Sequence, residues 1–247
     1  MENIFPTLSS LENNIQYTNY MEQPLQRLSA EEMVKELRKA GQEKRPADFR
    51  YKLMPEFSFS NKEIFTDLLF NNSTIQGAVY FENCKIRGSL IMDNVLIYRT
   101  LYIANSLIRG DFSAKEIRIR EVLNLVASGF RKNIIFDNSI VKGFFGLNKV
   151  KVEENLSAKR LSCLDISTKT GTIRGDVFLK EANIKGSVIL EEITAEGLAN
   201  LENSYIGEDL NLQNSRIKEN VLLTGTIIEG DVLGEGLECK NLIAHMK

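Results

Sequence analysis

The chain has 247 residues, of which 43% are hydrophobic and 26% are charged, and its formal net charge is −2. No apolar run approaches the roughly 20 residues that a transmembrane helix needs, so we expect no membrane span. The first six residues, Met-Glu-Asn-Ile-Phe-Pro, lack the basic start and apolar core of a secretion signal, which favours a cytoplasmic protein. The three cysteines are odd in number, and this favours reduced thiols over a disulfide framework or a metal site.

Residues 1–48 differ in pattern from residues 49–247. Residues 1–28 are rich in Asn, Gln and Glu without a clear period, which predicts an irregular arm. Ser29 and Glu32 then form a capping-box signature before a helical stripe of apolar residues, which holds Met33, Val34, Leu37 and Ala40. We expect this short helix to cap the repeat region that follows, with residues 42–48 as the linker. The alternative is a partner-binding helix.

From residue 53 onward the sequence repeats with a period of eleven. A first apolar column runs from Leu53 through Ile64 to Cys239, and each step is eleven residues except the step of ten from 163 to 173. Two further apolar columns lie four and six residues later. The three columns hold 51 apolar residues in 54 positions, so the repeat predicts the architecture before any other feature is considered. Apolar residues two apart mark one face of extended chain, which predicts short strands around an apolar interior.

Two polar columns separate the apolar runs and predict corners. The first is rich in glycine, which we expect to supply the backbone angles of tight turns. It holds Gly77, Gly88, Gly110, Gly143, Gly175, Gly186, Gly197 and Gly230. The second is rich in asparagine, which tolerates turn conformations and can stack in ladders between coils. It holds Asn61, Asn72, Asn83, Asn94, Asn105, Asn138, Asn203 and Asn214.

Two eleven-residue units make one coil, because a single unit is too short to surround its own apolar interior. The predicted fold is an all-β, single-stranded β-solenoid with a short N-terminal α-helical cap. It has about nine coils of about 22 residues and is roughly 43 Å long at about 4.8 Å per coil.

Units 182–190 (Ala-Asn-Ile-Lys-Gly-Ser-Val-Ile-Leu) and 204–212 (Ser-Tyr-Ile-Gly-Glu-Asp-Leu-Asn-Leu) resemble the repeats of pentapeptide-repeat proteins. The resemblance covers about residues 53–243 and implies a right-handed quadrilateral β-helix. The chain departs from the strict pattern by alternating five and six residues, similar to looser repeats in bacterial members. That superfamily includes DNA mimics that act on gyrase, effector domains and scaffolds.

Some outward-facing positions are apolar and are candidates for partner binding. The residue between the second and third apolar columns points outward, and contiguous exposed apolar surface typically marks an interaction. We expect a protein partner at Leu69, Ile91, Ile135 and Phe178 on one side of the rod and at Tyr80 and Tyr102 on another. The alternative is that residues 1–28 fold back along the rod and cover part of this surface.

Basic residues follow the first column on alternate units, at Arg87, Arg109, Arg131 and Arg174. Stacked at about 4.8 Å per coil, they would form an anion-binding ladder for an anionic polymer or a lipid surface. The alternative is a solvated strand face whose charge discourages unwanted sheet pairing. Residues 175–247 contain 13 acidic and 6 basic residues, so they carry −7 and the remainder +5. Opposite poles would favour head-to-tail attraction or a polarised partner surface.

The C-terminal end of the chain shows no cap comparable to the N-terminal helix. An uncovered last coil would present unpaired backbone groups and core side chains. We therefore expect self-association there, as a homodimer or higher oligomer, through Cys239, Leu242, Ile243 and His245. The alternative is local fraying of a polar last turn.

No enzymatic activity is predicted. His245 is the only histidine and has no triad-like setting, and the chain lacks a metal-ligand spacing, a phosphate loop and a dinucleotide fingerprint. We expect no catalytic residue, no cofactor and no metal. The predicted function is a scaffold that self-associates and binds a protein partner through a flat solenoid face. The alternatives are a modulator of a DNA topoisomerase or of DNA itself, and a polymer-forming cytoskeletal protein of the bactofilin type.

Overall fold

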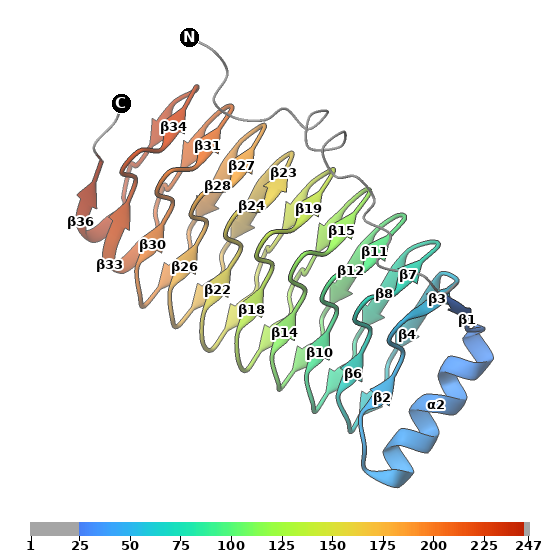
Figure 1. Ribbon diagram of the computed structural model, residues 1–247. Coiled ribbons are helices and arrows are strands. Elements are labelled where there is room, and N and C mark those ends of the chain that lie inside the picture. The colour runs from blue at the N-terminus through green and yellow to red at the C-terminus, as the bar shows by residue number, and fades with distance from the viewer. Residues whose placement is uncertain (1–24, 245–247) are drawn as a thin grey trace.

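The computed structural model describes residues 25–244. It is a β-solenoid of about ten turns of parallel stacked coils, with one helix at the N-terminal end (Figure 1). The predicted fold class is confirmed, with about one coil more than expected. Each complete coil contributes four strands, so the rod has four faces. We number the faces 1 to 4 in the order in which their strands follow one another along the chain.

Faces 1 and 2 are separate parallel sheets. Face 1 consists of β1 (Gln26–Arg27), β3 (Lys52–Met54), β7 (Thr74–Ile75), β11 (Leu96–Ile97), β15 (Arg118–Ile119), β19 (Ile140–Val141), β23 (Ser162–Cys163), β27 (Asn183–Ile184), β31 (Tyr205–Ile206) and β34 (Ile227–Ile228). Face 2 consists of β4 (Phe57–Ser60), β8 (Val79–Glu82), β12 (Leu101–Ala104), β16 (Leu123–Asn124), β20 (Phe145–Gly146), β24 (Ile166–Lys169), β28 (Val188–Glu191), β32 (Leu210–Asn211) and β35 (Val232–Leu233).

Faces 3 and 4 are joined into one sheet by the strands β33 (Arg216–Leu222) and β36 (Glu238–Ile243), which run round the corner between them. The other strands of face 3 are β5 (Glu63–Ile64), β9 (Lys85–Ile86), β13 (Leu107–Ile108), β17 (Gly129–Phe130), β21 (Lys151–Val152), β25 (Thr172–Ile173) and β29 (Thr194–Ala195). The other strands of face 4 are β2 (Ala47–Asp48), β6 (Leu68–Leu69), β10 (Leu90–Ile91), β14 (Phe112–Ser113), β18 (Ile134–Ile135), β22 (Leu156–Ser157), β26 (Val177–Phe178) and β30 (Ala199–Asn200).

The three apolar columns form the interior of the rod. Ile97, Leu101 and Ile103 are fully buried, and the corresponding residues of the neighbouring coils stack on them. The one-residue deletion is confirmed, because Phe145 pairs with Ile166, 21 residues later. The first and last coils differ from the predicted register. Met54, not Leu53, pairs with Ile75, and Leu242, not Ile243, pairs with Val221, because these coils are one residue shorter than the period of 22.

The asparagine column forms corners in the left-handed backbone region, as predicted. All eight asparagines have positive φ angles, between 49° and 60°. Asparagine adopts this region more readily than most residues. One side-chain ladder step joins Asn94 Nδ2 to Asn72 Oδ1 at 2.9 Å.

The glycine column has a different physical cause from the one we predicted. Its members do not have positive φ angles. A Cβ built on Gly88 would lie 2.5 Å from the backbone nitrogen of Asp67, and one on Gly110 would lie 2.6 Å from that of Ser89. At Gly88 and Gly110 glycine is therefore required, because the two consecutive coils approach too closely there for a side chain.

Buried hydroxyls after the asparagine corners link the coils, and the sequence analysis missed them. Ser106 Oγ donates to the carbonyl of Phe81 at 3.2 Å and accepts from the backbone N–H of Cys84 at 3.0 Å. Ser204 repeats the arrangement with Leu179 and Ala182. The Asn-Ser pairs in the sequence could have indicated these hydrogen bonds.

Replacing Ser106 with alanine should therefore lower the free energy of unfolding by about 2 kcal/mol, because the buried N–H of Cys84 loses its acceptor. Urea titration followed by circular dichroism measures the change. The matched control is Ser58→Ala, because the Ser58 side chain is exposed on face 2. Equal stability of the two variants would contradict this role for Ser106.

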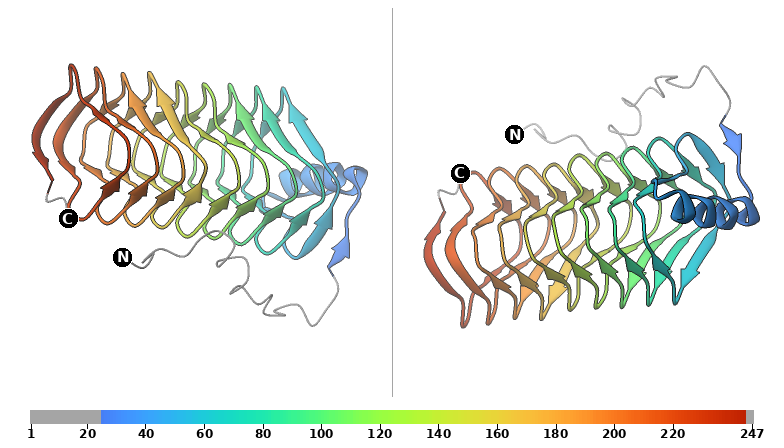
Figure 2. Two further views of the ribbon diagram at one scale, coloured as in Figure 1. Left: turned by 90° about the horizontal axis from the view of Figure 1, so that it is seen from above. Right: turned by 90° about the horizontal axis from the view of Figure 1, so that it is seen from below.

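Helix α2 (Ala30–Glu43) covers the first coil (Figure 2). The capping box of Ser29 and Glu32 is confirmed, and the helix continues past Gly41 to a left-handed C-cap at Lys44. Met33 and Ala40 are buried, but Val34 is 50% exposed, so it does not belong to the buried stripe.

The helix is tied to the first coil by the Glu36 carboxylate. Glu36 accepts from Arg45 Nη1 at 2.5 Å and from the backbone N–H of Asp48 at 3.1 Å, and the bond to Arg45 is the main cause of the lowered pKa of Glu36. Strand β2 begins at Ala47 and pairs with β6, so the solenoid starts before the boundary that we placed after residue 48. Within residues 25–244 no helix is long and apolar enough to cross a membrane.

Candidate interaction surfaces

The C-terminal coil leaves its inward side chains open. Val232 and Leu242 pair with Leu210 and Val221, which are both fully buried, yet Val232 is 41% exposed and Leu242 is 50% exposed. No strand in the described part of the chain pairs with the outer edge of β36. The two ends of the rod therefore differ among residues 25–244, because α2 covers the first coil whereas no described helix covers the last coil (Figure 2).

The predicted self-association residues fall in different places on this coil. Cys239 pairs with the inward Ile217 and is half-buried, and Leu242 is the exposed inward residue. Ile243 pairs with the outward Leu222, so it lies on the surface of face 4 and not in the interior column where we placed it. His245 lies outside the described residues. All three cysteines are free thiols, and burial raises the pKa of Cys163.

The last coil is also acidic. Its charged residues between 227 and 244 are Glu229, Asp231, Glu235, Glu238 and Lys240. Glu238 pairs with Arg216 at 2.6 Å and Lys240 pairs with Glu219 at 3.4 Å, so both interact with the preceding coil.

The predicted partner-binding residues lie on faces 4 and 2 and are all half-buried. On face 4, serines interrupt the apolar column, because Ser113 lies between Ile91 and Ile135 and Ser157 follows Ile135. Phe178 is covered by the Lys159 ammonium, 4.5 Å from the ring centroid, and Leu69 stacks beside Ile91. On face 2, the rings of Tyr80 and Tyr102 lie 6.2 Å apart and form an aromatic pair. The apolar surface is thus divided into short patches.

The predicted arginine ladder lies on face 3 and is partly neutralised. Arg87 pairs with Glu63 at 2.7 Å, and Glu153 pairs with both Arg131, at 3.6 Å, and Arg174. Hydrogen bonds from Arg87 and Lys85 lower the pKa of Glu63. Arg109 makes no ion pair with any residue of 25–244. Anion binding at this ladder stays a prediction, with Arg109 as its uncompensated member.

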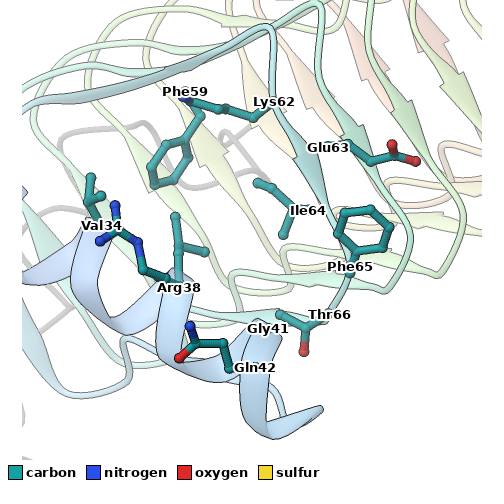
Figure 3. Close-up of a pocket in the computed structure, with 11 residues that line it drawn as sticks. Val34, Arg38, Gly41, Gln42, Phe59, Lys62, Glu63, Ile64, Phe65 and Thr66 are labelled. Carbon is teal, nitrogen blue, oxygen red and sulfur yellow. The ribbon is translucent and has the colours of Figure 1, made fainter.

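A groove between α2 and the first coil was missed by the sequence analysis. It has a volume of about 440 Å³, and its lining includes Val34, Leu37, Phe59, Ile64 and Phe65 (Figure 3). The sequence pattern placed Val34 in the buried stripe of α2, so it did not predict a groove beside Val34. Phe65 could have indicated the groove, because this aromatic residue occupies the outward position that holds arginine in the next coils.

No protein-family model matches the chain, and no curated protein matches it as a relative.

Proposed function

We propose that this protein is a non-enzymatic scaffold of the pentapeptide-repeat type that forms a dimer through its C-terminal coil. The observation that carries the proposal is the exposure of Val232 and Leu242 at positions that are fully buried in the preceding coil. Exposed core side chains beside an unpaired strand edge favour association with another chain.

A closed dimer fits the two different ends of the rod. A two-fold axis would bring β36 of each copy against the same strand of its partner, which is the self-complementary contact typical of dimers. Helix α2 covers the opposite end, so it opposes the end-to-end growth that a bactofilin-like polymer needs. The remaining strand faces, including the apolar patches of faces 2 and 4, would stay free for a protein partner.

The double variant Val232→Lys and Leu242→Lys should weaken dimerisation at least a hundredfold, because each copy would bring two ammonium groups into the apolar contact. Sedimentation equilibrium measures the dissociation constant. The matched control is Leu164→Lys, because Leu164 is 46% exposed but directly follows β23, away from the last coil. The proposal is wrong if the double variant associates as tightly as the unchanged protein, or if the control has the same effect.

A further inference from the structure

The groove beside α2 combines an apolar floor with uncompensated positive charge. Phe59 and Ile64 form a nearly buried floor, while Val34 and Phe65 form the walls and are 50% and 64% exposed. Val34 comes from the helix and Phe65 from the first coil, so the packing of the cap against the rod creates the groove (Figure 3).

Two cations stand at the rim of the groove. Arg38 projects from α2 and Lys62 from the first coil, and both line the groove. Neither makes an ion pair with any residue in the described part of the chain. Such unpaired cations are available to an incoming anion.

The acidic residue in the lining, Glu63, is already engaged by cations. Its carboxylate lies 3.2 Å from Lys85 Nζ and 2.7 Å from Arg87 Nη2. Arg87 also stacks over Phe65, with 4.7 Å from its guanidinium carbon to the ring centroid. The surface around the aromatic wall is therefore positive, and it continues along face 3 to Arg109.

We propose that this groove binds an acidic peptide segment of a partner protein, with one large apolar side chain between Val34 and Phe65 and carboxylates on Arg38 and Lys62. A peptide fits better than a small molecule, because small-molecule sites bury most of their ligand, whereas the wall residues Val34 and Phe65 are 50% and 64% exposed. Apolar grooves bind the anchor side chains of peptides, and clusters of basic residues recognise acidic motifs. Helix α2 lies at the end of the rod opposite β36 (Figure 1), so occupation of the groove that α2 lines does not depend on the proposed dimer.

The test is fluorescence anisotropy with the full chain and a labelled nine-residue peptide that has a central phenylalanine among aspartates and glutamates. Phe65→Ser should weaken binding at least tenfold, because the ring loses its apolar contact. Arg38→Gln combined with Lys62→Gln should weaken binding about tenfold at low salt and reduce its salt dependence. The matched controls are Leu164→Ser, just after β23, and Lys185→Gln, which removes a positive charge far from the groove. Both variants should bind the peptide normally. The dimer variant Val232→Lys with Leu242→Lys should also bind normally, which separates this proposal from the dimer.

Several results would overturn the proposal. One is equal binding of a peptide in which lysines replace the acidic residues. Another is unchanged affinity in Phe65→Ser, whose exposed position should leave the fold intact, as thermal denaturation checks. Binding of laurate without binding of the peptide would identify an amphiphile site instead. Competition by a second copy of the chain, seen as loss of peptide binding at high protein concentration, would identify the acidic C-terminal coil as the occupant.

Discussion

Replacing Phe112 with alanine should lower the free energy of unfolding by about 3–5 kcal/mol. Phe112 is fully buried on face 4, with its ring 5.8 Å from that of Phe130 and 5.2 Å from that of Phe136. The substitution leaves a cavity at the centre of the rod, and coils held above and below by backbone hydrogen bonds cannot collapse into it. Phe112 belongs to the apolar columns that the sequence predicts, so this loss measures how much those columns contribute to stability.

Urea unfolding followed by circular dichroism measures this loss. Phe65→Ala is the matched control, because Phe65 is 64% exposed, and we expect a change of less than about 0.5 kcal/mol. A loss of only 1 kcal/mol in Phe112→Ala would mean that the interior is loosely packed, contrary to the structure.

Replacing Gly110 with alanine should also destabilise the protein strongly, by about 3 kcal/mol. The added Cβ would lie 2.6 Å from the backbone nitrogen and 2.7 Å from the Cα of Ser89, so two coils must move apart. Because the obstacle is backbone, a change of side-chain rotamer cannot relieve it.

The matched control for this prediction is the same substitution at Gly41. This glycine lies inside α2, and an added Cβ would have no atom within 4 Å. Gly41→Ala should raise stability by up to about 1 kcal/mol, because alanine favours the helix. Thermal denaturation compares the two variants. If Gly110→Ala were as stable as Gly41→Ala, the close approach of the coils would be disproved.

The fold could be predicted from the period of eleven because each apolar column corresponds to one row of inward-facing side chains. Side chains two residues apart share a face, and a regular step keeps them aligned, so Ile97 and Leu101 could be placed inside the rod from sequence alone. The asparagine corners could also be predicted, because few other residues adopt a left-handed backbone readily. The irregular first and last coils could not, because a shortened coil shifts the register without changing the apolar character of Leu53 or Ile243.

The interaction surfaces were less accessible to sequence reasoning. A column position gives the direction of a side chain but not what covers it, so Phe178 could not be seen to lie beneath Lys159 or Arg87 to be paired with Glu63. The groove depends on the angle at which α2 packs on the first coil. At this angle Val34 is exposed, although it is next to the buried Met33 in the sequence. The exposed end was anticipated from the lack of a second cap, but the identity of its inward residue, Leu242, required the register of β33 and β36.

Sedimentation velocity over a concentration series, at low and high salt, tests the proposed dimer most directly. We expect a monomer and a discrete dimer, and the dimer should persist or strengthen at high salt because the contact is apolar and its surrounding acidic side chains repel each other. A monomer at every concentration would contradict the proposed dimer. Polymers that grow with concentration and shrink with salt would also contradict it, because they would mean that the acidic C-terminal coil binds the basic N-terminal part of the next copy.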